Sequence, residues 1–393
     1  MNSSLKRIPA TYSRVALTFI ISVVLIALSA GLGCSVKHTE SWPMYMKDSQ
    51  HTGMAQSGIA PPLKLKLKKM LGGMPGSVVG DKESLFPGDG HDNSFRINRT
   101  TGQIIWQKKA GGFFSPGISS DKVIFTSADY ELLCLNQSDG RVIWKRKLFG
   151  GGSGAICVFQ GKLYVDDFIR ILCIDAETGN VIWNRKFNTA PDESPVASDG
   201  SVFIGSAEGV FYCLDSKNGK TKWEYTFPFQ QGQHLRPIPG PAIVVGNRVI
   251  SCSTTVVCLE ADTGKEVWSF KPDGEIGYVS PTTDGESVFI PDQKGNLFCL
   301  SIATGKQVWH TKSSSSYMEG CVTEGYLYIT NLDGYLHCID VSTGKDVWEY
   351  NVTEGGPRHT PDIHYPGPPI LINDTLILAS ENGYLYWFGN NNK

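Results

Sequence analysis

The chain has 393 residues, with 36 basic and 38 acidic side chains and a formal net charge of −2. A near-neutral chain without a contiguous block of Lys and Arg lacks the phosphate-neutralising surface of a nucleic-acid-binding protein. With 41% hydrophobic and 19% charged residues, the composition is globular rather than disordered. The length fits two or three average domains, or one large closed all-β domain.

The first forty residues carry an export pattern. Lys6, Arg7 and Arg14 precede an uncharged apolar run at positions 15–33, which ends in small residues. This is the pattern of a secretory signal, although a run of this length also suffices for an uncleaved membrane anchor. Under either alternative, the charge distribution places the chain after Glu40 outside the cytoplasm.

Cys34 follows the apolar run directly, and the sequence GLGC resembles the lipobox of bacterial lipoproteins. We therefore predict that Cys34 is a lipid attachment site. The alternative is that Cys34 is the last residue of an uncleaved anchor. The chain then divides into a signal or anchor (1–33), a lead-in segment (34–62) and a repeat domain (63–393).

One motif, a glycine followed four residues later by a tryptophan, recurs seven times at spacings of about forty residues. A period near forty, with short alternating strands and turn residues in each unit, is typical of propeller blades with four strands apiece. The seven pairs are Gly102 and Trp106, Gly140 and Trp144, Gly179 and Trp183, Gly219 and Trp223, Gly264 and Trp268, Gly305 and Trp309, and Gly344 and Trp348.

The two ends of the repeat region complement each other. After Trp348 the chain offers three inner strands but no further Gly-xxx-Trp strand. At positions 63–68, Leu and Lys alternate strictly, which predicts a half-buried strand with one solvated face. We infer that this strand completes the last blade from outside and removes its free edge. The prediction is an all-β, eight-bladed propeller of four-stranded blades, closed by an N-terminal strand.

Six of the ten cysteines occupy one repeat position, six residues before the motif glycine. They are Cys134, Cys173, Cys213, Cys258, Cys299 and Cys338. Because a repeat position is spread around a ring, these cysteines cannot converge on a metal or pair with one another, and we interpret them as small core residues. Cys157 and Cys321 share a second position, in units three and seven. A bridge between Cys252 and Cys258 remains open.

The repeat resembles that of the PQQ-like, or quinoprotein-type, β-propellers. The stretch from Ile174 to Trp183 matches the family's tryptophan-docking repeat, and the opening SWPMYMKDSQHTG, positions 41–53, matches its lead-in. One branch of the family comprises dehydrogenases that bind pyrroloquinoline quinone (PQQ) and calcium. The other comprises lipid-anchored periplasmic propellers of the BamB type, accessory subunits of the outer-membrane β-barrel assembly machine.

The size, blade count and N-terminal anchor favour the BamB-type branch, and the adjacent-cysteine disulfide of the dehydrogenases is missing. The resemblance therefore implies a non-enzymatic scaffold on the periplasmic face of the outer membrane, with other envelope proteins as partners and no cofactor. The alternative is a PQQ-binding dehydrogenase that oxidises alcohols or sugars. Under the first alternative, no catalytic, cofactor-binding or metal-binding residue is expected.

The insertion at positions 227–241 lengthens one repeat, and loops on a rigid scaffold are common partner-binding sites. We predict that this loop, with Phe229, His234 and Arg236, contacts a partner, the alternative being an incidental solvent loop. His359 and His364 are expected in a solvated loop rather than in a metal site.

Two further segments are expected to have neither a catalytic nor a phosphate-binding role. The adjacent carboxylates Asp166 and Asp167 interrupt a strand pair, and adjacent strand residues face opposite ways, so we expect a polar turn rather than a catalytic pair. The glycine-rich stretch GGGSGA, positions 150–155, lacks the Lys and Ser/Thr of a phosphate-binding loop. It is interpreted as a flexible entry to an inner strand.

Overall fold

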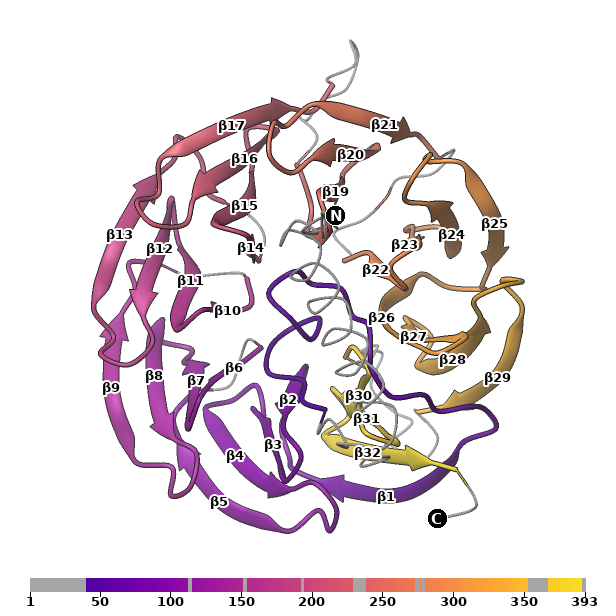
Figure 1. The fold of residues 1–393 in the computed structure, drawn as a ribbon. Coiled ribbons are helices and arrows are strands. Elements are labelled where there is room, and N and C mark those ends of the chain that lie inside the picture. The colour runs from indigo at the N-terminus through magenta and orange to yellow at the C-terminus, as the bar shows by residue number, and fades with distance from the viewer. Residues whose placement is uncertain are drawn as a thin grey trace, which may run out of the picture. The chain divides into compact units, whose positions relative to one another are not determined.

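Alternating apolar residues and glycine turns divide the repeat region into short strands, which a computed structural model arranges as a closed ring (Figure 1). The structure describes residues 40–111, 115–150, 154–191, 194–228, 238–272, 276, 280–352 and 367–390. These residues form eight antiparallel sheets of four strands each and contain no helix. The predicted eight-bladed all-β propeller is confirmed.

The first four blades follow the chain, with the innermost strand first. Blade 1 comprises β2 (Val78–Gly80), β3 (Ser84–Pro87), β4 (Asn93–Asn98) and β5 (Ile104–Lys109). Blade 2 comprises β6 (Gly117–Ser119), β7 (Lys122–Thr126), β8 (Glu131–Asn136) and β9 (Val142–Lys147). Blade 3 comprises β10 (Cys157–Phe159), β11 (Lys162–Asp167), β12 (Arg170–Asp175) and β13 (Val181–Lys186). Blade 4 comprises β14 (Val196–Ser198), β15 (Ser201–Ser206), β16 (Val210–Asp215) and β17 (Thr221–Thr226).

The other four blades complete the circle. Blade 5 comprises β18 (Ala242–Val245), β19 (Arg248–Cys252), β20 (Val256–Glu260) and β21 (Glu266–Phe270). Blade 6 comprises β22 (Thr282–Thr283), β23 (Ser287–Pro291), β24 (Asn296–Ser301) and β25 (Gln307–Lys312). Blade 7 comprises β26 (Tyr317–Thr323), β27 (Tyr326–Asn331), β28 (Tyr335–Asp340) and β29 (Asp346–Asn351). Blade 8 comprises β30 (Ile370–Ile372), β31 (Thr375–Ser380), β32 (Tyr384–Gly389) and β1 (Lys64–Met70).

The outer strand of blade 8 comes from the other end of the chain, as predicted. β1 pairs antiparallel with β32, and Leu67 lies opposite Trp387. Figure 1 shows the indigo β1 beside the yellow β32, where the two ends of the ring meet. This pairing satisfies the edge of β32 and joins the first described part of the chain to the last.

In blades 1 to 7, the motif tryptophan lies at the joint with the next blade. Trp144 of blade 2, for example, donates its indole Nε1–H to the carbonyl of Ala176 in blade 3 at 3.1 Å. Its ring covers Gly179, whose φ is +72° and whose hypothetical Cβ would lie 2.6 Å from the Trp144 ring. Only glycine combines that backbone conformation with that close approach. The motif therefore encodes the joint between blades.

The six repeat cysteines lie on the third strand of their blades, each opposite the motif tryptophan of the fourth strand. All six are buried free thiols, which confirms their interpretation as core residues. Cys252 pairs with Val256 and Cys258 pairs with Ile250, so the two are not opposite each other, and both are free thiols. The core is built between neighbouring blades; one apolar cluster, for example, combines Cys173 of blade 3 with Ile204 of blade 4.

The described part of the lead-in segment, residues 40–62, lies inside the ring, where it bonds the innermost strand of one blade after another (Figure 1). Carbonyl groups of the lead-in accept hydrogen bonds from backbone amides of blades 1, 2, 4, 5, 6 and 7. These pairs are Trp42 with Gly80, Pro43 with Ile118, Ser49 with Ala197, Gln50 with Val244, Thr52 with Thr283, and Gly53 with Val322. The lead-in therefore acts as a hub for the inner strands.

A buried ion pair fixes the shape of this hub. Lys47 Nζ lies 3.0 Å from Glu40 Oε1, and both side chains are buried. Glu40 also accepts the backbone amides of Gln56 and Ser57. A buried charge pair of this kind costs desolvation energy and is retained when further hydrogen bonds complete it, as they do here.

Candidate functional site

An exposed aromatic cluster stands on the face of the ring that carries the turns between second and third strands and the connections between blades. Its members are Tyr130, Phe149 and Phe168. Phe149 is 83% exposed, Phe168 57% and Tyr130 44%. Tyr130 lies in the β7–β8 turn, Phe168 in the β11–β12 turn, and Phe149 in the connection from blade 2 to blade 3.

Three contacts hold the cluster together. The guanidinium carbon of Arg170 lies 4.3 Å from the centre of the Phe149 ring, a cation–π contact. The side chain of Phe168 lies over Gly150, where a Cβ would come within 3.0 Å of it. The amide of Leu148 donates to the carbonyl of Tyr130 at 2.8 Å. The backbone that carries Phe149 is thus fixed against both neighbouring turns.

Asp167 is the buried support beneath the cluster. One carboxylate oxygen accepts the amide of Phe149, and the other accepts a hydrogen bond from Arg170 in an ion pair. Asp167 is 1% exposed, whereas the Arg170 side chain is 25% exposed, so the carboxylate end of the pair is shielded from solvent. Through Asp167, the same Arg170 that stacks on Phe149 is held in place.

This arrangement corrects the expectation for Asp166 and Asp167. They do not form a solvated polar turn, because both lie in β11 and both are buried. The turn is the next two residues, and it places Phe168 at its tip. The backbone amides that Asp166 and Asp167 accept, from Gly154 and Phe149, explain why carboxylates are stable at the end of an inner strand.

Backbone strain marks the same two turns. Blades 4, 6, 7 and 8 have glycine four residues before the repeat position of the third strand, with φ between +82° and +89°. Blade 2 has Tyr130 at that position, with φ of +59°, and Phe168 has φ of +60° in the shorter turn of blade 3. A non-glycine residue in this region costs about 1–2 kcal/mol. The aromatic residues are kept there despite that cost, as strained residues at binding sites commonly are.

A second polar group lies inside the ring, where the lead-in meets blades 6 and 7. We call its members, Tyr45, His51, Ser280 and Glu319, the channel residues. The hydroxyl of Tyr45 contacts Ser280 Oγ at 2.8 Å and donates to Glu319 Oε1 at 2.9 Å. Burial raises the pKa of the Glu319 carboxyl. His51 packs edge-on against Tyr45, and burial lowers its pKa to about 3, so its imidazole is neutral.

These channel residues do not fit PQQ, the cofactor of the dehydrogenase branch. PQQ carries three carboxylates, which need cationic or strongly donating partners. The group around Tyr45 offers hydroxyls, one carboxyl and one neutral imidazole, while Lys47 of the lead-in is already paired with Glu40.

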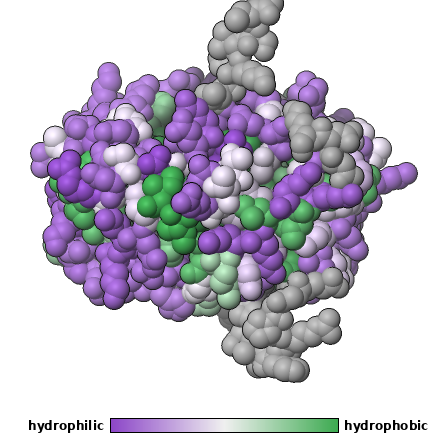
Figure 2. Space-filling model, turned by 90° about the horizontal axis from the view of Figure 1, so that it is seen from below, coloured by the Kyte–Doolittle hydropathy of each residue, from purple (hydrophilic) through white to green (hydrophobic). Residues whose placement is uncertain are grey.

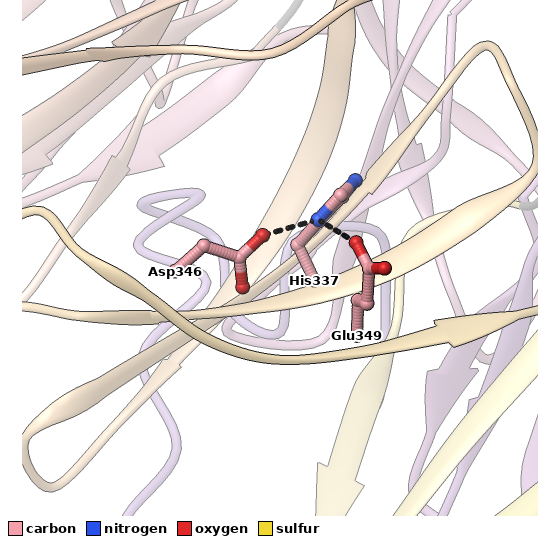
Figure 3. A group of neighbouring side chains, drawn as sticks. All are labelled: His337, Asp346 and Glu349. Carbon is pink, nitrogen blue, oxygen red and sulfur yellow. Dashed lines mark hydrogen bonds and ion pairs between the residues drawn. The ribbon is translucent and has the colours of Figure 1, made fainter.

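His337, Asp346 and Glu349 form a third group, on the wall of blade 7 (Figure 3). His337 Nδ1 donates to Asp346 Oδ2 at 2.6 Å and lies 3.8 Å from Glu349 Oε2. Two ligands of one tetrahedral zinc, each about 2.0–2.1 Å from the ion, would be about 3.3 Å apart. The Nδ1–Oδ2 contact is shorter than that, so this is a hydrogen-bonded group that orients an imidazole.

Several residues singled out from the sequence lie outside the described residues. They are Cys34, the three members of the predicted contact loop (Phe229, His234 and Arg236), and the histidine pair (His359 and His364). The aromatic cluster was missed by sequence reasoning. Its one available signal was Tyr130, an aromatic residue at a repeat position that four other blades fill with glycine.

A family model described as "Outer membrane protein assembly factor BamB" matches the chain over residues 49–155 and 138–350. The chain belongs to this family. The matched region includes the aromatic cluster, most of the lead-in hub and the motif joints of the first seven blades. In the part of the chain that the structure describes, no helix has the length and apolar character needed to cross a bilayer.

Solved structures of two kinds of protein, a BamB and a quinohemoprotein alcohol dehydrogenase, resemble this chain. BamB from Moraxella catarrhalis superposes with a TM-score of 0.67 at 17% identity, covering 85% of this chain and 99% of that one. Quinohemoprotein alcohol dehydrogenase from Comamonas testosteroni superposes with a TM-score of 0.68 at 14% identity, covering 89% and 80%. At these identities the superpositions show the fold alone.

The curated relatives are longer proteins. Tetrathionate hydrolase from Acidithiobacillus ferrooxidans is 24% identical over 241 residues, which is 53% of this chain and 41% of that protein. Quinoprotein ethanol dehydrogenase from Pseudomonas putida is 27% identical over 116 residues, which is 28% of this chain and 18% of that protein. The chain spans less than half the length of the curated relatives it matches.

Proposed function

We propose that the protein is a non-enzymatic, envelope-anchored scaffold that binds the outer-membrane β-barrel assembly machinery through its aromatic cluster. The observation that carries the proposal is the exposure of Phe149 and Phe168, held by Arg170 and the buried Asp167. Aromatic side chains, phenylalanine included, and arginine are enriched at protein–protein interfaces relative to the rest of the protein surface.

The family match supports this choice of partner, because the family is described by its role in outer-membrane protein assembly. The export pattern at the N-terminus supports a periplasmic location with attachment at Cys34. The channel residues support a scaffold rather than a PQQ enzyme, since they lack the charges that the cofactor needs.

Co-purification from detergent-solubilised membranes tests the proposal. The wild-type chain is expected to carry subunits of the β-barrel assembly machine with it, and a Phe149→Ser, Phe168→Ser variant is expected to lose them. The matched control is Val308→Ser, since Val308, on the wall of blade 6, is as exposed as Phe168. Retention of the subunits by the double variant would contradict the proposal, as would a stoichiometric quinone absorbance with dehydrogenase activity in the purified protein.

A further inference from the structure

Positive charge is concentrated on one half of the outer wall of the ring. The outer strands of blades 8, 1, 2 and 3 are β1, β5, β9 and β13, which follow one another around the circumference (Figure 1). These strands carry eleven basic side chains and no acidic one, and we call this set the basic wall. Its members are Lys64, Lys66, Lys68, Lys69, Lys108, Lys109, Lys145, Arg146, Lys147, Arg185 and Lys186.

The other half of the wall has the opposite balance. The outer strands of blades 4 to 7 carry two lysines, Lys222 and Lys312, against four carboxylates. The carboxylates are Glu224, Glu266, Asp346 and Glu349. With a net charge of only −2 for the whole chain, the basic wall is a local feature and not a consequence of composition. The excess of basic side chains on these four outer strands therefore requires an explanation specific to this half of the ring.

Most of the basic wall is available to a partner. Eight of its eleven side chains are exposed, and the ion pairs found among the described residues involve none of the eleven. The side of the ring below β1 and β5 is mainly hydrophilic, with apolar patches between the polar side chains (Figure 2). Exposed Ile105, Ile143 and Ile182 lie on these same outer strands. Basic side chains interleaved with aliphatic ones are typical of surfaces that rest on a lipid headgroup layer.

The point where the described chain begins lies in the same half of the ring. The amide of Glu40 donates to Asn373 Oδ1, at 3.4 Å, in the turn between β30 and β31. The chain thus enters the ring at blade 8, which also contains β1. Cys34, the predicted lipid attachment site, is six residues upstream, and six residues span at most about 20 Å.

We propose that the basic wall binds the anionic phospholipid surface of the membrane to which the chain is attached, so that this half of the ring is turned towards the bilayer. The inference rests on the membrane attachment predicted from the sequence and not on the aromatic cluster. An anionic bilayer is favoured over an acidic protein because the wall shares its half of the ring with the entry of the membrane-proximal chain.

The curvature of the wall limits how many charges act at once. A convex ring meets a flat bilayer along about two neighbouring blades, whereas charges beyond the Debye length of about 8 Å contribute little at physiological salt. Each basic residue near an anionic membrane strengthens partition by about fivefold. Removal of four exposed lysines is therefore expected to weaken binding by at least about tenfold, even if half of them are outside contact.

Vesicle flotation tests the proposal with a chain that begins at Glu40, so that no anchor can insert. This part contains every described strand and the β1–β32 closure, and it therefore includes all that the ring needs to fold. Vesicles of phosphatidylcholine are compared with vesicles that also contain phosphatidylglycerol. The test variant replaces Lys64, Lys66, Lys108 and Lys145 by Gln. The control variant replaces four exposed lysines of blades 5 to 7 by Gln, namely Lys265, Lys306, Lys312 and Lys345.

The wild-type chain and the control variant are expected to float with the phosphatidylglycerol vesicles, less so as salt is raised, and not with phosphatidylcholine alone. The test variant is expected to lose at least about tenfold in partition. Equal partition of the test variant and the wild type would overturn the proposal, and so would a wild type that ignores phosphatidylglycerol. Because the full-length test variant keeps Phe149 and Phe168, its co-purification with assembly subunits separates a failure here from a failure of the proposed function.

Discussion

The indole Nε1 of Trp387 donates a hydrogen bond to the carbonyl of Arg99, at 2.7 Å, across the joint where the ring closes. At the six joints from blade 1 to blade 7 the donor is the motif tryptophan of the outer strand, but β1 has Leu67 there. Leu67 fills the space over Gly102, and Trp387, from the neighbouring strand, supplies the hydrogen bond. The closing joint thus reproduces the contact of the other joints with two residues in place of one.

Trp387→Phe should weaken the closing joint. The substitution keeps an aromatic ring but removes the donor, and we expect the free energy of unfolding to fall by about 1–2 kcal/mol. Urea titration measures it. Trp309→Phe is the matched control, because Trp309 makes the same bond, at 2.7 Å, to Val341 between two blades formed by continuous chain.

Both variants should lose similar stability, but they should differ in where the ring opens. Hydrogen exchange in β1 should accelerate in the Trp387 variant and remain unchanged in the Trp309 variant. An unchanged free energy of unfolding for Trp387→Phe would show that this hydrogen bond does not contribute to closure.

Gly179→Ala and Gly161→Ala form a matched pair within blade 3. Both glycines have φ of +72°, but a Cβ on Gly161 would meet nothing within 4 Å, whereas one on Gly179 would overlap the Trp144 ring. We expect Gly161→Ala to cost about 1–2 kcal/mol for backbone strain alone. Gly179→Ala should cost about 1–3 kcal/mol more, because the rigid indole must move. Equal thermal or urea stability of the two variants would mean that the blade joint is looser than the structure indicates.

His51 should make the protein sensitive to acid. Its folded pKa, about 3, lies below the ordinary value of about 6.5 for histidine, because burial disfavours the imidazolium. Between these values the unfolded state binds a proton that the folded state does not, so stability decreases as the pH falls below 6.5. This single group should contribute a slope of about 1.4 kcal/mol per pH unit.

His51→Asn should remove that contribution, and Asn tolerates the positive φ of 55° at this position. Urea titrations of both proteins between about pH 7 and about pH 5 measure the difference in slope. Parallel pH profiles would show that His51 is hydrated in the folded protein.

The nine described cysteines should be unreactive in the native protein. Burial raises the pKa of their thiols, for example to about 12 for Cys252 and Cys258 and to about 11 for Cys173, so almost no thiolate is present near neutral pH. A thiol reagent should label them only after unfolding. Mass spectrometry of the unfolded, unreduced protein should find Cys252 and Cys258 each labelled; a peptide that links them would reveal a disulfide.

The fold could be predicted because the same Gly-xxx-Trp motif recurs in seven blades. Gly102 and Trp106 have counterparts about every forty residues along the chain, so the strand assigned to a motif position in one blade can be assigned to the same position in the others. The closing strand could be inferred because the last blade lacks an outer strand and the amphipathic strand at positions 63–68 lacks a partner. Pairing the two removes both free edges. The path of the lead-in could not be inferred, since its bonds are made by backbone carbonyls and leave no pattern in side chains.

The aromatic cluster escaped prediction for a different reason. Phe149 follows an ordinary outer strand, and its exposure depends on how two turns and a connection converge in space. Asp166 and Asp167 were misjudged because carboxylates usually prefer solvent, whereas here backbone amides and Arg170 satisfy them. The cluster is formed by residues of two neighbouring blades, so the sequence of a single repeat unit does not reveal it.

Site-specific photo-crosslinking in intact cells tests the central claim most directly. A photoreactive amino acid at position 149 should form an adduct with a subunit of the β-barrel assembly machine, and one at position 308, on the outer wall of blade 6, should not. The absence of such an adduct at position 149, or equal adducts from both positions, would contradict the assignment of the aromatic cluster as the partner-binding surface.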